Sequence, residues 1–249
     1  MLVEQKRWGN IPLLHVYSND MDDHAPTVIF LHGFMSAKEH NLHYAYQLVQ
    51  KGVRVILPDA KWHGERSENF KEAQMNVRFW EIVLQSIHEV GLLAKALQDH
   101  YTPQGIGVAG TSMGGIVTAG CIKRYDWLQT AAICMGAPSF VQLAAYQLQQ
   151  FAEKGIDFHM SAQEIAQTNE LLAQYDVAFT PEKFANRAVF FWHGKLDKTV
   201  PFADTYHFYE QLQQRNEGEL QFMVDENTGH AVSREGMLAA TDWLAQHLA

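Results

Sequence analysis

Residues 106–115 read Ile-Gly-Val-Ala-Gly-Thr-Ser-Met-Gly-Gly and contain a G-x-S-x-G motif centred on Ser112. The apolar run Ile106–Ala109 before the motif predicts a buried strand, and the segment Gly115–Ala119 after it predicts a helix. A serine between the two lies at a tight turn, where the flanking glycines prevent the two arms of the chain from colliding. The stretch therefore predicts a nucleophile elbow, the alternative being a Gly-Ser turn that only ends a strand.

Seven further segments, most of them apolar runs, predict strands on either side of this one. They are Leu2–Trp8, Leu13–Ser18, Thr27–Leu31, Val53–Leu57, Ala131–Met135, Ala188–Trp192 and Leu220–Val224. A Gly9-Asn10 turn joins the first two, which predicts an antiparallel hairpin. The later runs are continuously apolar, as in strands buried on both faces, and longer amphipathic segments separate them. This alternation is typical of an α/β fold, a mostly parallel eight-stranded sheet with helices on both faces.

The segment from Ser139 to Asn186 breaks the alternation. It holds two or three helical stretches and no convincing strand. Ser161, followed by Glu164, is a capping-box start, and Thr180-Pro181 indicates a second helix start. We therefore expect residues 1–249 to form a single α/β domain with a small helical cap at about 139–186.

Composition and charge exclude several classes of function. The formal net charge is −9, with 28 acidic against 19 basic residues, so the chain lacks the basic surface that nucleic-acid binding requires. The N-terminus has no apolar signal region, and no apolar stretch reaches about 18 residues, so we expect no membrane contact and a cytoplasmic location. Cys121 and Cys134 are too few for a disulfide scaffold and are predicted to be reduced. A monomer or small homo-oligomer is expected.

A serine hydroxyl needs an adjacent base to act as a nucleophile, and the chain offers 13 histidines. His230 is favoured because it follows the last predicted strand within Asn227-Thr228-Gly229-His230 and precedes the last helix. Folds with this kind of elbow carry their catalytic residues in the chain order serine, acid, histidine, so the base comes last. His207 and His247 fall within predicted helices and are interpreted as surface residues.

The acid that orients the base should lie between the serine and the histidine in the chain. Asp197 follows the strand Ala188–Trp192 directly, so its carboxylate can reach a loop at the end of the neighbouring strand. Asp225 and Glu226 are competitors on the histidine's own loop, and Asp204 lies where the next helix begins. Asp197 is therefore the predicted acid, the alternative being an ordinary solvated loop aspartate.

Two backbone N–H groups are predicted to stabilise negative charge on a reacting carbonyl oxygen. Met113 opens the helix after the elbow, so its N–H points toward the place where this charge develops. His32-Gly33-Phe34 follows the strand Thr27–Leu31, and the glycine lets the Phe34 N–H turn into the site. The alternative for this second segment is a plain glycine turn.

With these pieces in order, the chain resembles the α/β-hydrolase superfamily over essentially its whole length. It is most similar to small bacterial carboxylesterases related to dienelactone hydrolase and to the catalytic domain of prolyl oligopeptidase. The motifs that carry the resemblance are His32-Gly33-Phe34, Pro58-Asp59-Ala60-Lys61-Trp62-His63-Gly64-Glu65-Arg66, Gly110–Gly115, His193-Gly194 with Asp197, Val200-Pro201 and Gly229-His230. The resemblance implies a catalytic triad of Ser112, Asp197 and His230, an oxyanion hole from the Phe34 and Met113 backbones, and no cofactor.

These features predict a serine carboxylesterase that hydrolyses small, short-acyl esters through an acyl-enzyme on Ser112. Thioesterase or amidase activity by the same triad, a cofactor-free haloperoxidase or lyase, and a non-catalytic ligand-binding protein remain alternatives. No propeller domain precedes the predicted hydrolase domain, so peptide cleavage is not expected. A metal site at Asp59 and His63 is not expected, since no further ligand is spaced to complete it.

The predicted cap carries apolar residues that need a surface to pack against, among them Phe140, Tyr146 and Phe151. The insertion leaves the sheet at the carboxyl edge, where ligands bind in open α/β sheets. We therefore expect the cap to lie over the site as a lid that restricts the acyl group to short chains. The alternative is that it packs on the side of the domain and never touches the substrate.

Overall fold

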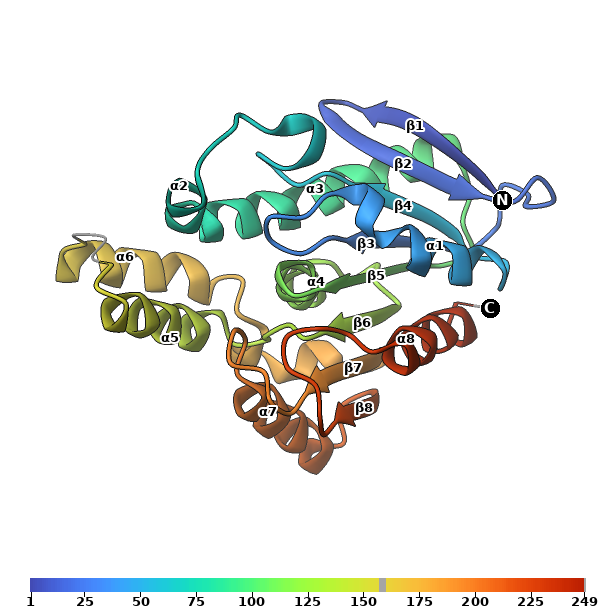
Figure 1. The fold of residues 1–249 in the computed structure, drawn as a ribbon. Helices are drawn as coiled ribbons and strands as arrows, with labels where there is room; N and C mark the ends of the chain where they lie inside the picture. Colours follow the sequence, from blue (N-terminus) through green and yellow to red (C-terminus); the bar gives the residue numbers. More distant parts are fainter. Residues whose placement is uncertain (157–159, 249) are drawn as a thin grey trace.

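An eight-stranded sheet forms the centre of the computed structural model, which describes residues 1–156 and 160–248 (Figure 1). The strand order is β1-β2-β4-β3-β5-β6-β7-β8, with β1 and β2 antiparallel to their neighbours and the remaining pairs parallel. The strands are β1 (Leu2–Trp8), β2 (Ile11–Tyr17), β3 (Thr27–Leu31), β4 (Arg54–Pro58), β5 (Ile106–Thr111), β6 (Thr130–Cys134), β7 (Ala188–Gly194) and β8 (Glu219–Asp225). The predicted hairpin, the eight strands and the mostly parallel sheet are confirmed.

The helices cover both faces of the sheet. They are α1 (Leu42–Val49), α2 (Glu72–Val77), α3 (Phe79–His100), α4 (Met113–Arg124), α5 (Phe140–Glu153), α6 (Ala162–Ala173), α7 (Phe202–Arg215) and α8 (Arg234–Gln246). Short 3-10 turns add η1 (Lys38–Asn41), η2 (Gly64–Arg66), η3 (Val177–Phe179) and η4 (Pro181–Phe184). Buried side chains of α1 and α8 pack on one face of the sheet, and those of α3, α4 and α7 pack on the other.

Strand periodicity explains how one sheet supports two cores. In β3, Ile29 and Leu31 belong to the core beneath α3 and α4, whereas Val28 and Phe30 belong to the core beneath α1 and α8. Successive side chains of a strand point to opposite faces, so a continuously apolar strand is buried on both sides. The prediction of burial on both faces was wrong for β8, whose residues are exposed or half-buried, because β8 is the edge strand of the sheet.

The segment predicted as a cap contains α5, α6, η3 and η4, and no strand among the residues that the structure describes there. The Ser161 hydroxyl accepts a hydrogen bond from the Glu164 N–H, and the Glu164 carboxylate accepts one from the Ser161 N–H, which confirms the capping box. The start at Pro181 opens only the single turn η4. Residues 157–159 of the predicted cap lie outside the described residues.

Within residues 1–156 and 160–248, no helix combines the length and the apolar character needed to cross a bilayer.

Candidate active site

Ser112 occupies a strained turn between β5 and α4. Its backbone has φ 54° and ψ −117°, a conformation that a residue with a side chain rarely adopts and that costs of order 1–3 kcal/mol. Neighbouring glycines make the turn possible. A Cβ on Gly110 would lie 2.5 Å from the carbonyl carbon of Gly114, and a Cβ on Gly114 would lie 2.1 Å from the Leu31 oxygen. The structure therefore has the geometry of a nucleophile elbow at the predicted residue.

The structure brings Ser112, His230 and Asp197 together in one hydrogen-bonded chain. The Ser112 Oγ–H donates to His230 Nε2 at 2.7 Å, and the His230 Nδ1–H donates to Asp197 Oδ2 at 2.7 Å. This direction follows from the carboxylate, which can only accept and so fixes the imidazole proton on Nδ1. The free lone pair on Nε2 then faces the serine hydroxyl, as removal of the serine proton requires.

The Asp197 carboxylate is buried and accepts hydrogen bonds at both oxygens. Oδ1 accepts the N–H groups of Thr199 at 2.8 Å and Val200 at 3.0 Å. Oδ2 accepts from His230 and also lies 3.2 Å from Nε2 of His193. Burial alone would raise the pKa of Asp197, but the hydrogen bonds from His193 and His230 outweigh it and hold the pKa well below its usual range. The carboxylate therefore stays ionised and able to accept the His230 Nδ1–H.

His193 is a site residue whose role sequence reasoning missed. It is the next-to-last residue of β7, 1% exposed, and its Nε2–H donates to the Val200 oxygen at 2.9 Å while also facing Asp197. These contacts hold the Asp197–Val200 turn against the strand end. The only sequence signal was its place in the His193-Gly194 motif.

Gly194 lets the loops after β7 and β8 approach one another. A Cβ at this position would lie 2.4 Å from the carbonyl oxygens of Thr228 and Gly229, so any side chain would push the His230 loop away. Backbone hydrogen bonds from Leu196 to Thr228 at 3.0 Å and from Lys195 to Asp225 at 2.8 Å join the two loops. These contacts position His230 above Asp197.

The other carboxylates considered as the orienting acid make contacts elsewhere in the structure. Asp225 accepts the N–H of Asn227 at 3.1 Å and so stabilises its own turn. Glu226 forms an ion pair with Lys195, and Asp204 lies in the first turn of α7.

The two predicted oxyanion donors flank Ser112. Met113 is the first residue of α4 and follows the serine directly. A Cβ on Gly33 would lie 3.5 Å from the Ser112 Cβ, which shows how closely the loop after β3 passes the serine. In the part of the chain that the structure describes, the Phe34 N–H donates to no other protein group. A carbonyl oxygen bound beside Ser112 could accept from it.

Two buried histidines hold the segment His32-Gly33-Phe34, which we call the oxyanion loop after its predicted role, against the loop after β4. The His32 Nδ1–H donates to the Gly33 oxygen at 2.7 Å, and its Nε2 accepts the Ala60 N–H at 3.0 Å. The His63 Nδ1–H donates to the Lys61 oxygen at 2.8 Å, and its Nε2 accepts the Met35 N–H at 3.1 Å. Both imidazoles must be neutral to accept at Nε2, and burial lowers the pKa of His32 to about 4 and lowers that of His63.

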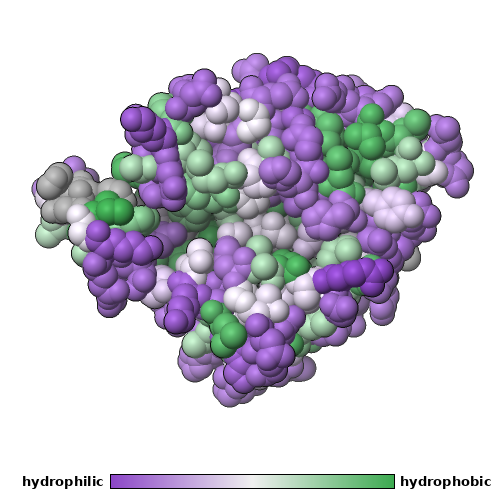
Figure 2. All heavy atoms as spheres, viewed as in Figure 1, coloured by the Kyte–Doolittle hydropathy of each residue, from purple (hydrophilic) through white to green (hydrophobic). Residues whose placement is uncertain are grey.

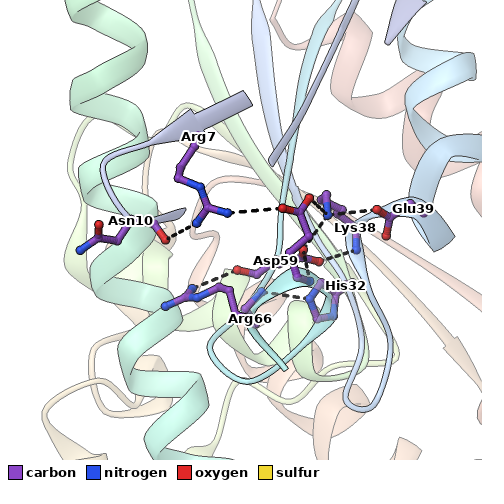
Figure 3. Close-up of polar contacts among 9 residues, drawn as sticks. Arg7, Asn10, His32, Lys38, Glu39, Asp59 and Arg66 are labelled. Atoms are coloured by element: carbon purple, nitrogen blue, oxygen red, sulfur yellow. Dashed lines mark hydrogen bonds and ion pairs between the residues drawn. The ribbon is translucent and has the colours of Figure 1, made fainter. Parts of the chain in front are cut away.

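An ionic network around Lys38 and Asp59 adjoins the same loop (Figure 3). Lys38 Nζ donates to Asp59 Oδ2 at 2.7 Å, the Lys38 N–H donates to Oδ1 at 3.0 Å, and both residues are almost wholly buried. Burial alone would lower the pKa of Lys38, but hydrogen bonds to Asp59, Glu65 and Glu39 outweigh it and raise it. Arg66 donates to the Asp59 backbone oxygen and forms a two-point ion pair with Glu89 on α3. Through these hydrogen bonds, Asp59 and His63 hold the loop after β3 against the loop after β4.

Replacing His32 with alanine is expected to lower kcat for ester hydrolysis about 10- to 100-fold and to leave KM within about threefold. Removal of one oxyanion donor costs about 10²–10³ in kcat, and misplacing the Phe34 N–H should cost part of that. Steady-state kinetics measure kcat and KM separately. An asparagine side chain can restore only the donor to Gly33, so His32→Asn should recover part of the loss, whereas His207→Ala on the surface of α7 should change nothing. A rise in KM alone would contradict a role in holding the oxyanion loop.

A cavity of about 220 Å³ opens beside Ser112. Its walls come from the oxyanion loop, α3, α4, α5 and the turn after Asp197, and they include Phe34, Phe79, Ile116, Tyr146 and Val200. The Tyr146 hydroxyl donates to the Lys198 oxygen at 2.6 Å, which ties α5 to the Asp197 loop. We call this cavity the first chamber.

The prediction that the cap lies over the site agrees with the positions of some of the aromatic residues named for it, but not of all. Tyr146 and Phe151 line the first chamber, so α5 does reach the site. Phe140 does not: it is fully buried in the core against Trp80, with ring centroids 5.3 Å apart, because it opens α5 at the point where the helix leaves the sheet. Truncating Phe140 would therefore damage the core and not the pocket.

Cys121 and Cys134 are both unpaired and fully buried, and burial raises the pKa of each thiol. Among residues 1–156 and 160–248, no cluster of three or more His, Cys, Asp or Glu side chains is placed to hold a metal ion. The prediction that the chain needs no cofactor stays a prediction.

Comparison with known proteins agrees with this fold and site. The prolyl oligopeptidase family matches residues 39–249. The chain is 39% identical to "Putative esterase YitV" of Bacillus subtilis and 29% identical to "Esterase YjfP" of Escherichia coli, in each case over 99% of both chains. The crystal structure of TT1662 from Thermus thermophilus superimposes with a TM-score of 0.77 at 20% identity, covering 100% of this chain and 99% of that one.

The family match spans most of the chain and includes the elbow and the loops that carry Asp197 and His230. At 20% identity the structural likeness supports the fold alone, and the fold is the one implied by the sequence motifs. The chain therefore belongs to the prolyl oligopeptidase family and is a hydrolase with the α/β-hydrolase fold.

Proposed function

We propose that the chain is a serine carboxylesterase that hydrolyses small carboxylic esters with short acyl groups through an acyl-enzyme on Ser112. The observation that carries the proposal is the chain of two 2.7 Å hydrogen bonds from Ser112 through His230 to Asp197. The names of the two relatives, which both contain the word esterase, support the choice of ester over other acyl substrates.

The proposed reaction uses each residue in one role. His230 takes the hydroxyl proton while Ser112 Oγ attacks the ester carbonyl carbon, and Asp197 stabilises the imidazolium that forms. The N–H groups of Phe34 and Met113 donate to the carbonyl oxygen as it becomes negative. His230 then gives its proton to the departing alcohol oxygen, leaving an acyl-enzyme. Water, deprotonated by His230, attacks this ester and releases the carboxylic acid.

The position of His230 supports placing the acyl group in the first chamber. The alcohol must leave on the His230 side, because Nε2 delivers its proton. His230 does not line the first chamber, whereas Phe34 of the oxyanion loop does. A chamber that the base does not line is therefore the place we propose for the acyl chain, and its volume of about 220 Å³ suits a short one.

We also propose that residues 139–186 act as a cap on a single domain, with α5 as one wall of the acyl site. A small-molecule ester is the only partner that the proposed reaction requires. A cytoplasmic location and a monomer or small homo-oligomer stay predictions.

The purified protein is expected to hydrolyse p-nitrophenyl acetate and butyrate and to be labelled at Ser112 by an organophosphonate, with one label per chain. Matched thioester and anilide substrates, assayed in parallel, test the preference for oxygen esters. Peptide mass mapping locates the label. Labelling at another residue, or binding of esters without turnover, would contradict the proposed mechanism.

A further inference from the structure

A second cavity of about 120 Å³ adjoins the first chamber and lies between the α2–α3 side and the α5–α6 side of the molecule. The two cavities share Asn76, Gln147 and Phe151, which stand at their junction. Figure 2 shows pale green side chains lining the hollow between the α5–α6 end and the rest of the molecule. We call this cavity the second chamber.

The walls of the second chamber are mainly apolar. They are formed by Val77, Trp80, Ala144, Leu148 and Ile165, together with the polar residues Asn76, Gln147, Thr168 and Asn169. Val77 is 63% exposed, so an apolar group placed in the chamber would cover side-chain surface that now faces solvent. No residue of the His230 or Asp197 loops lines it.

We propose that the second chamber is a subsite for an apolar end group on the acyl chain, of phenyl or compact alkyl size. This inference rests on the proposed function and refines its acyl specificity: a short linker occupies the first chamber, and the apolar end passes Phe151 into the second. The preferred substrates would then be esters of small carboxylic acids that end in such a group, rather than acetyl esters.

Three observations support this assignment. No residue of the His230 loop lines either chamber, and the two chambers share Asn76, Gln147 and Phe151, so an acyl chain in the first chamber can continue into the second. Its volume approaches the roughly 150 Å³ of an apolar protein cavity that binds benzene. The two chambers together reach the lower end of the range of about 300–1,000 Å³ that is usual for small-molecule sites.

The test compares p-nitrophenyl 4-phenylbutyrate with p-nitrophenyl butyrate, two esters that differ only in the terminal phenyl group. Burial of an aryl group in an apolar chamber should raise kcat/KM for the phenylbutyrate by about tenfold or more in the wild-type enzyme. Thr168→Phe fills the second chamber from α6 and is expected to abolish this preference. Its turnover of p-nitrophenyl acetate, which does not reach the chamber, should remain within about twofold.

Gln167→Phe is the matched control, because it adds the same ring to the exposed neighbouring position of α6. It should keep the preference for the phenylbutyrate. Ala144→Phe fills the chamber from the opposite wall on α5 and gives a second variant if Thr168→Phe fails to fold.

Equal kcat/KM values for the two esters, or a preference that survives both filling variants while acetate is still hydrolysed, would overturn the subsite. Calorimetry separates this failure from failure of the proposed function. If the protein hydrolyses no ester, 4-phenylbutyrate should still bind at least about tenfold more tightly than butyrate, and Thr168→Phe should remove the difference. Equal binding of the two acids would then reject the subsite as well.

Discussion

Replacing Ser112 with alanine is expected to lower kcat/KM for p-nitrophenyl acetate by up to about 10⁶-fold, because the variant loses the nucleophile and retains only binding and oxyanion stabilisation. Alanine keeps the Cβ and the backbone constraints of serine, so the turn at φ 54° should persist. The melting temperature, followed by circular dichroism, should therefore shift by only a few degrees. Initial rates at high enzyme concentration measure the residual activity.

Ser18→Ala, after the end of β2 and in a different part of the sheet, is the matched control and should retain full activity. Loss of organophosphonate labelling in Ser112→Ala, but not in Ser18→Ala, would tie the label to the elbow. Residual turnover above about 1% in a preparation free of contaminating esterase would mean that another group attacks the ester.

The fold was predictable because its signals are local and agree with one another. β5 and the glycines around Ser112 fix an elbow that few other folds contain, and each predicted run overlaps its strand, although β2, β5, β7 and β8 are one or two residues longer than predicted. The chain order Ser112, Asp197, His230 also carries spatial information, because parallel strands end at the same edge of a sheet. The hydrogen bonds between these side chains could thus be anticipated from order alone.

What the sequence could not reveal depends on packing between distant segments. The length of an apolar run does not say whether a strand lies at an edge, so the exposure of β8 was missed. Helical periodicity marks Phe140 and Tyr146 as apolar in the same way, although one enters the core and the other lines the site. A cavity such as the second chamber arises between α3 and α6, which are far apart in the chain.

The supporting histidines illustrate the same limit. The chain contains 13 histidines, and composition alone does not single out His32, His63 and His193 from the other ten. Their roles come from backbone groups that reach them across loops, such as the Ala60 N–H on His32 and the Val200 oxygen on His193. Each of these histidines is followed by a glycine (Gly33, Gly64 or Gly194). This was the only sequence signal that two backbone segments approach each other closely at these positions.

Replacing Asp197 with asparagine is expected to lower kcat by about 10⁴-fold with little change in KM. The wild-type carboxylate accepts from Thr199 and Val200 at one oxygen and from His230 at the other. An amide has only one oxygen, and this oxygen should accept the hydrogen bonds from the two backbone N–H groups. The NH₂ group then faces His230 Nδ1 and donates to it, which moves the imidazole proton to Nε2. In that tautomer His230 cannot accept the Ser112 proton.

Asp225→Asn is the control, since that carboxylate accepts from the Asn227 N–H on the other loop, and its effect should stay within about threefold. The pH profile gives an independent check. Because the pKa of Asp197 is held well below its usual range, this carboxylate should stay ionised as the pH falls and add no proton uptake of its own, so log kcat/KM of the wild type should decline with a slope no greater than one. A slope of two would show that a further group, such as the Asp197 carboxylate, takes up a proton in the same range. Equal losses in Asp197→Asn and Asp225→Asn would place the orienting acid on the His230 loop, because only a carboxylate in contact with Nδ1 can set the tautomer.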